Sequence, residues 1–254
     1  MMELQRELSL IFYKACAELR AEAARTYAGF LWWILEPLIS MSIYYLVFSF
    51  ILARNIENYA VFLCCGLIPW RWFQSSVMCG ANSVVSSRSL MQQVYIHKLV
   101  FPCTSLLSNT FKFLIILGLL IAFVLLGGYS PSVHYLAIPV IMLAQGAFIA
   151  GCTLWCAAIM PFLPDFRLLL LNLLQLMMFM SGIFYKVDRV PEKLQTVLLL
   201  NPMTGIIAAY RNVLLYNSWP DWAYLGGITL FSLLLILTST RIIHRFDRIY
   251  PKIA

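Results

Sequence analysis

The chain has 254 residues, of which 62% are hydrophobic and 11% are charged, and its mean hydropathy is +0.83. This composition excludes an ordinary soluble enzyme or binding module and predicts an integral membrane protein. The formal net charge of +7 is interpreted as a topology signal with some attraction to anionic membrane lipid, so no nucleic acid partner is expected.

Residues 1–31 predict an amphipathic helix that lies along the inner surface of the membrane. Apolar side chains such as Leu4, Ile11 and Leu19 recur at helical steps, and charged side chains fill much of the other side. Because charges occur throughout this segment, it does not resemble a cleaved signal peptide. A simple anchor and a mechanical role are both open for it.

Six apolar stretches are long enough to cross the bilayer, since a helical span needs about 20 mainly apolar residues. They cover residues 32–53, 60–83, 104–127, 135–160, 168–185 and 222–243. A further apolar segment, 190–216, is interrupted by Asn201-Pro202. Because proline breaks a helix, this segment predicts a re-entrant helical hairpin on the outer side rather than a seventh span. The expected fold is therefore all-α, with a single transmembrane domain over residues 32–254.

The basic residues of the loops predict the orientation of the chain. With the N-terminus inside, eleven Lys and Arg side chains fall on the cytoplasmic side. Five fall on the outer side, namely Arg54, Lys186, Arg189, Lys193 and Arg211. Because cytoplasmic loops carry an excess of Lys and Arg, both termini are expected in the cytoplasm.

The sequence contains none of the common signatures of an enzyme or a metal site. None of the six lysines is followed by Ser or Thr, so a phosphate-binding GxxxxGK[ST] loop is absent, and no His is followed by Glu. The seven cysteines lie mostly within the apolar stretches and predict neither disulfides nor a metal site. His97, His134 and His244 fall at span ends or in loops. A membrane acyltransferase that uses one of these histidines is kept as an alternative function.

Three charged residues fall inside predicted spans, where an ionised group needs a partner or a cavity. Glu36, Arg71 and Lys112 have depths that would place them in one polar layer in the inner half of the membrane. In one interpretation Glu36 pairs with Lys112 or Arg71 only to hold the helices together. In the other, Arg71 lies on a transport pathway and attracts a phosphate group of the cargo.

Aromatic residues are concentrated in the first two predicted spans. The set comprises Trp32, Trp33, Tyr44, Tyr45, Phe48, Trp70, Trp72 and Phe73. Several lie deeper than the interfacial belt that Trp and Tyr usually occupy. Aromatic faces pack on sugar rings, so these residues suit the lining of a polysaccharide pathway, although helix packing explains the same spacing.

Three blocks of sequence resemble the membrane subunit of polysaccharide-exporting ABC transporters. The longest begins at Phe62-Leu-Cys-Cys-Gly-Leu-Ile-Pro-Trp-Arg-Trp-Phe73 and continues through Ser83-Val-Val-Ser-Ser-Arg-Ser-Leu90 to Val94-Tyr-Ile-His-Lys-Leu-Val-Phe-Pro102. The others are Gly29-Phe-Leu-Trp-Trp-Ile-Leu-Glu-Pro-Leu38 and Asn201-Pro-Met-Thr-Gly-Ile-Ile-Ala-Ala-Tyr-Arg211. The blocks follow in order over nearly the whole chain.

This resemblance implies a permease in the bacterial cytoplasmic membrane that moves lipid-linked polysaccharide, most readily O-antigen, with capsule or teichoic acid as alternatives. It implies a homodimer of six-span subunits with two copies of a separate ATPase subunit, which uses ATP and Mg while this chain binds no cofactor. The carrier's pyrophosphate would enter near Arg25, and the sugar would pass the aromatic residues and Arg71.

The same resemblance implies roles for two segments. Residues 86–102 would form a coupling helix, with ATPase contacts from Arg88, Gln92, Tyr95, His97 and Lys98. Residues 190–216 would form helices at the outer mouth, with a gate that includes Asn201, Pro202, Tyr210 and Arg211. The alternatives are a small-lipid or drug exporter of the same architecture and, in another class, a passive lipid scramblase.

Overall fold

A computed structural model describes residues 2–25, 27, 29–47, 58–163, 165–187, 190–247 and 249–250. Across these residues the chain is helical, with no β-strand, which confirms the all-α prediction there. The main helices are α1 (Met2–Ala24), α2 (Trp32–Tyr45), α3 (Tyr59–Ser86), α4 (Arg88–Gln93), α5 (Val100–Leu126), α6 (Ile138–Ile159), α7 (Phe166–Met180), α8 (Glu192–Leu199), α9 (Pro202–Leu214) and α10 (Trp222–Phe246).

Three described segments are long and apolar enough to cross a membrane: α5, α6 with the 3-10 turn before it (Val133–Ile159), and α10. A fourth is possible if the bent pair α8 and α9 counts as one span. Helix α3 has 28 residues but carries more polar side chains, and α7 has 15 residues. Helix α2 has 14 residues, and residues 48–53 of the first predicted span lie outside the described residues.

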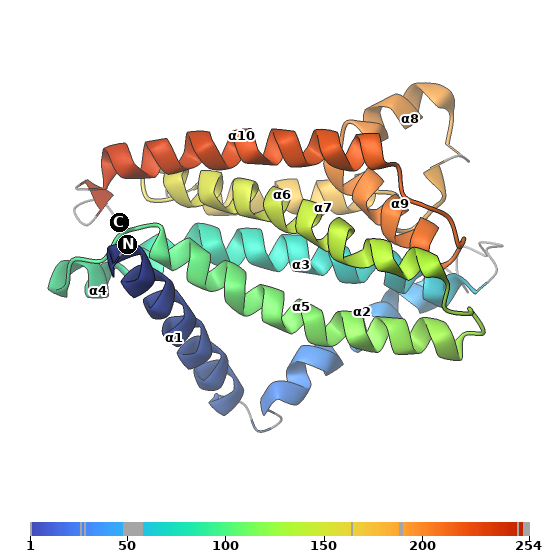
Figure 1. Ribbon diagram of the computed structural model, residues 1–254, viewed down its shortest axis with the longest axis horizontal. Coiled ribbons are helices and arrows are strands. Elements are labelled where there is room, and N and C mark those ends of the chain that lie inside the picture. The colour runs from blue at the N-terminus through green and yellow to red at the C-terminus, as the bar shows by residue number, and fades with distance from the viewer. Residues whose placement is uncertain are drawn as a thin grey trace.

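Helix α3 forms the centre of the bundle, with α5, α6 and α9 packed around it (Figure 1). Most of its side chains from Tyr59 to Val84 are buried. The approach of α6 is close at Gly80, where an added Cβ would lie 2.1 Å from the Thr153 Cγ2. Small residues at helix interfaces let backbones approach in this way. Most side chains of α3 therefore face the interior of the subunit.

Helix α1 lies against α5 and runs obliquely to the long bundle helices (Figure 1). Lys14 lies over the Phe101 ring, 4.2 Å from its centroid, and pairs with Glu18 one turn on at 3.6 Å. Exposed Leu8 and Phe12 alternate with charged residues on the same helix. The described part of α1 thus has the amphipathic character that the sequence predicts.

A second, smaller core closes the end of the molecule near α4, where α1 begins and α10 ends (Figure 1). It joins the ends of α3, α5, α6 and α10 through Val84, Met91, Phe101, Leu154, Ala157, Ala158, Ile243 and Tyr250. The Tyr250 hydroxyl donates to the Ala158 carbonyl at 3.1 Å. Burial, together with the charge of Asp247, raises the pKa of Tyr250 to about 12, so this phenol stays a protonated donor near neutral pH.

The opposite end of the molecule carries the bent pair α8 and α9, whose axes differ by 96°. The break falls at Asn201-Pro202, as the sequence predicts. Asn201 caps α9 by accepting a hydrogen bond from the Met203 N–H at 3.1 Å, and Pro202 occupies the first turn, where its missing N–H costs nothing. The same Asn201 side chain donates to the Ser181 hydroxyl at 2.8 Å, which fixes the bend to the end of α7.

Candidate functional site

Four charged side chains line one cavity of about 390 Å³ between α1, α2, α3 and α5. Arg71 of α3 donates to Glu36 of α2 at 2.9 Å, which confirms that these two predicted intramembrane charges meet. Lys112 of α5 takes a different partner, Glu22 of α1, with Nζ to Oε distances of 2.5 and 2.7 Å. The three predicted charges therefore gather at one cavity, together with an acidic residue of the N-terminal helix.

Neighbouring polar groups hold both cations of this layer. Arg71 also donates to the Ser40 hydroxyl at 2.5 Å. The Trp33 indole N–H donates to Glu22 at 3.2 Å, and Lys112 lies 5.4 Å from the centroid of the Trp33 ring. Two cations face two carboxylates, so the layer has no net charge. A phosphate drawn to Arg71 would have to compete with Glu36 for the guanidinium.

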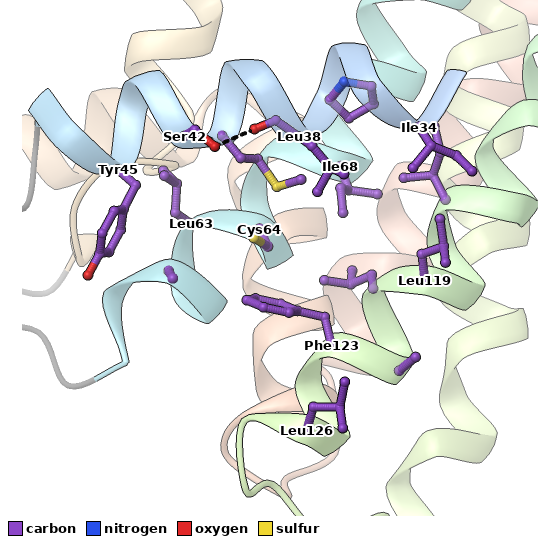
Figure 2. A pocket seen from close by; sticks show the side chains of 16 residues that line it. Ile34, Leu38, Ser42, Tyr45, Leu63, Cys64, Ile68, Leu119, Phe123 and Leu126 are labelled. Carbon is purple, nitrogen blue, oxygen red and sulfur yellow. Dashed lines mark hydrogen bonds between the residues drawn. The ribbon is translucent and has the colours of Figure 1, made fainter. Parts of the chain in front are cut away.

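A larger apolar cavity of about 490 Å³ adjoins the charged one between α2, α3 and α5. In Figure 2, Leu38 and Tyr45 of α2, Leu63 of α3 and Phe123 of α5 surround it. Pro37 is among the residues that line both cavities. The groove along α2 thus changes from polar at the α1 end to apolar at the other. Such a groove suits an amphiphile or the side chains of another helix.

The aromatic residues divide into a buried and an exposed group. Trp70 is 0% exposed and Trp72 is 5% exposed, and Trp72 stacks on Phe113 with centroids 4.1 Å apart and planes 8° from parallel. Within this subunit both tryptophans are core residues, so the packing alternative describes them better than a pathway lining. Phe73 is buried as well and stacks on a core phenylalanine of α6.

The aromatic residues of α2 are more accessible. Trp32 is 44% exposed, and Trp33 is half-buried above the charged cavity. Tyr44 packs on Phe184 with centroids 5.1 Å apart, and Tyr45 reaches the apolar cavity. Arg25, expected at the entrance for pyrophosphate, follows α1 and is exposed. Phe48 lies outside the described residues.

The predicted coupling segment is only partly helical. Helix α4 has six residues, residues 94–97 have no regular structure, and α5 begins at Val100. Arg88 and Gln92 are exposed, as an ATPase contact requires. Lys98 instead is 1% exposed and lies inside the subunit.

Side chains of this segment contact the end of α10 in a group of five residues that we name the α10 joint: Tyr95, His97, Lys98, His244 and Asp247. The Tyr95 hydroxyl donates to Asp247 at 3.0 Å, and the Lys98 ammonium lies 3.8 Å from the other Asp247 oxygen. The His97 Nε2 and His244 Nδ1 are 3.1 Å apart. This pairing could not be predicted from the sequence, because it joins residues about 150 positions apart.

Arg211, predicted as part of an outer gate, is buried, and its guanidinium forms a set of hydrogen bonds that we call the Arg211 staple. It donates to the carbonyls of Gly182 at 2.7 Å, Ile183 at 2.8 Å and Phe62 at 3.3 Å. Its guanidinium carbon lies 3.5 Å from the centroid of the Phe62 ring. The guanidinium fits here because Gly66 has no side chain: an added Cβ would lie 2.8 Å from an Arg211 nitrogen. Arg211 therefore joins α9, the turn after α7 and α3, and Tyr210 beside it is fully buried.

The fold and these contacts define the class of the protein. It is a multi-pass helical membrane protein with a charged layer among its helices, a helical segment bent by 96°, and an amphipathic N-terminal helix. Residues 12–215 match the family of ABC-2 type transporters, and the chain belongs to this family. It is therefore a transport subunit, which agrees with the resemblance found in the sequence.

Three relatives are similar over most of their length. The chain is 29% identical to the O-antigen export system permease protein RfbA of Myxococcus xanthus, over 95% of both chains. It is 26% identical to the protein of the same name from Klebsiella pneumoniae, over 89% of this chain and 87% of the relative. The Polysialic acid transport protein KpsM of Escherichia coli is 23% identical over 86% of each chain.

Proposed function

We propose that this chain is the permease subunit of an ATP-driven exporter that moves lipid-linked polysaccharide, most readily O-antigen, across the bacterial cytoplasmic membrane. The observation that carries the proposal is the similarity over 95% of both chains to a permease named for O-antigen export. Capsular polysaccharide is the alternative cargo, supported by the weaker similarity to a polysialic acid transport protein.

The proposed assembly has two copies of this chain and two copies of an ATPase subunit, which supplies ATP hydrolysis with Mg. Each copy crosses the membrane six times with both termini in the cytoplasm. The start of α1 and the end of α10 lie at the same end of the molecule, beside α4, which supports this topology (Figure 1). Exposed apolar side chains on α2 and α7, such as Leu38, Ile43 and Leu169, leave surface for lipid and for a second copy.

In the proposed mechanism, ATP binding closes the ATPase subunits and residues 86–102 transmit that movement to the helices. The carrier's pyrophosphate enters near Arg25 at the base of α2. The sugar chain then passes the accessible aromatic residues of α2, Trp32, Tyr44 and Tyr45, with the bent pair at the outer mouth. Trp70 and Trp72 are not included in this lining, because both pack mainly within one subunit and Trp72 lines the charged cavity instead.

Deletion of the gene in its own host tests the function directly. Surface polysaccharide is stained while lipid-linked glycan is extracted from the cytoplasmic side. Loss at the surface with accumulation inside, both reversed by the wild-type gene, is the expected result, and the accumulated glycan identifies the cargo. Unchanged surface glycan without accumulation would reject polysaccharide export in favour of a small-lipid exporter or a scramblase.

The same strain tests the aromatic lining. Complementation with Tyr44→Ala plus Tyr45→Ala should lower export while the dimer persists, because the ring faces that contact sugar are removed. Phe231→Ala is the matched control, since this ring is 50% exposed on α10, away from the groove. Full export by the double variant would contradict the lining.

A further inference from the structure

We propose that α10 is the rigid element that carries movement from the ATPase-facing segment to the bent pair at the outer end, and that the α10 joint is where this movement enters. The proposal rests on the proposed function for the existence of an ATPase partner. Residues 86–102 are linked directly along the chain to α3 and α5, and movement could pass to these helices alone. The proposal adds a second path for the movement, through α10.

The joint holds an otherwise irregular segment by its side chains. Residues 94–97 have no regular structure, and besides the Val94 N–H bond to Leu90 and the packing of Ile96 on the smaller core, the contacts of Tyr95, His97 and Lys98 with α10 hold them. Lys98 is 1% exposed and Asp247 is 8% exposed, which places their opposite charges together in a poorly solvated environment. Separating such a pair strands a buried charge, so the segment and the end of α10 are expected to move together.

The two contacts of Asp247 differ in kind. One oxygen accepts a hydrogen bond from the Tyr95 hydroxyl at 3.0 Å. The other lies 3.8 Å from Lys98, which is an ion pair and is too long for a hydrogen bond. The same ammonium donates to the Ile96 carbonyl at 3.1 Å and lies 4.8 Å from the centroid of the Tyr95 ring. Asp247 thus connects both ends of the irregular segment to one helix.

Helix α10 is long and well supported along its length. Its 25 residues correspond to about 37 Å at 1.5 Å per residue. Helix α6 packs closely against it at Gly151, where an added Cβ would lie 2.9 Å from the Leu235 Cβ. The Trp155 indole N–H donates to the Thr238 hydroxyl at 3.0 Å. Because packed helices with fixed contacts shift as units, α10 and α6 are expected to respond to the joint as one body.

The far end of α10 meets the bent pair directly. Tyr224, in the first turn of α10, lies against Gly205 of α9 so closely that an added Cβ would be 1.9 Å from its ring. Figure 1 shows α10 running from the α4 end of the molecule to the end that carries α8 and α9. A displacement of α10 at the joint therefore reaches α9 without an intervening loop.

The test uses the full complex with its ATPase subunits in lipid nanodiscs for exchange and hydrolysis, and the complemented deletion strain for export. Asp247→Asn and Asp247→Ala weaken the joint from the α10 side, so every side chain expected to contact the ATPase is left in place. Tyr250→Phe is the matched control, because it removes a hydrogen bond at the same end of the molecule, to Ala158 of α6, without touching residues 94–98. Hydrogen–deuterium exchange of peptides covering residues 192–214 is measured with and without ATP.

In the wild type, ATP is expected to change exchange in α8 and α9. The two joint variants should keep ATP hydrolysis but lose this ATP-dependent change, and export should fall about 2- to 30-fold, the range expected when one contact of a coupling network is removed. Tyr250→Phe should retain the ATP-dependent change. A purely structural role for the joint would lower folding, hydrolysis and export together and would not separate them.

The inference is overturned if Asp247→Asn retains the ATP-dependent change in α8 and α9, or if the wild type shows no such change while it exports glycan. A failure of the proposed function gives a different result, because the wild-type complex itself would then neither hydrolyse ATP in a cargo-dependent manner nor restore surface polysaccharide to the deletion strain.

Discussion

Arg211 gives the sharpest stability prediction, because a buried guanidinium holds three segments that are distant in sequence. Replacing it by Met keeps an unbranched apolar chain and removes every donor. The carbonyls of Gly182 and Ile183 lose hydrogen bonds of 2.7 and 2.8 Å, and that of Phe62 loses a longer one of 3.3 Å. The expected result is a loosened contact between α9, the turn after α7 and α3.

The size of the effect follows from these contacts. A hydrogen bond that involves a charged group contributes about 1.5–3 kcal/mol, so the two short ones contribute about 3–6 kcal/mol. Relief from burying the cation offsets part of the loss, which leaves a net destabilisation of about 2–4 kcal/mol for Arg211→Met. Arg211→Lys should cost less, because the ammonium stays charged but cannot reach all three carbonyls with the geometry of a guanidinium.

Thermal unfolding of the purified protein in detergent measures the loss. A chain of this size shifts its midpoint by about 2–4 °C per kcal/mol, so Arg211→Met should unfold about 4–16 °C below the wild type. Arg245→Met, at an exposed arginine of α10, is the matched control and should unfold within about 1 °C of the wild type. A midpoint for Arg211→Met equal to that of the control would refute the reasoning.

Three further predictions concern the contacts between helices. Gly80→Val should lower the unfolding midpoint and the yield of folded protein, because its Cβ would meet the Thr153 methyl at 2.1 Å and overpacking costs about 1–3 kcal/mol. Unchanged stability would show that α3 and α6 are not so closely packed. A double-mutant cycle of Glu36→Gln and Arg71→Gln should give a coupling energy of about 1 kcal/mol or less, because the Glu36 side chain is 69% exposed. A coupling well above this value would mean that another element, such as a second subunit, covers the pair. Lys112→Met should free α1 from α5, since the 2.7 Å bond to Glu22 is lost, and limited proteolysis near residue 25 should become faster. An unchanged cleavage rate would contradict this role.

The local chemistry of the sequence determined much of the architecture. The long apolar stretches predict α3, α5, α6 and α10, and the amphipathic pattern predicts α1. The break at Asn201-Pro202 also follows locally, because a proline after a capping residue begins a new helix wherever the chain lies. A partner for Glu36 was predictable because ionised groups among apolar helices need one, but depth left open whether that partner is Arg71 or Lys112.

Tertiary structure decided which partner each side chain takes. Helical periodicity defines the faces of a helix, but it does not say which neighbour covers a face. Trp70 and Trp72 therefore suited a pathway and a core equally well, until packing around α3 buried both. The same reason explains why Glu22 bonds Lys112 and why Asp247 holds residues 94–98: both contacts join separate helices far apart in the chain. Sequence alone determined that this chain is helical and adapted to a membrane, through local hydropathy and proline positions. The staple at Arg211 and the joint at α10 arose only when the helices packed, because only packing brings their carbonyls and charges within bonding distance.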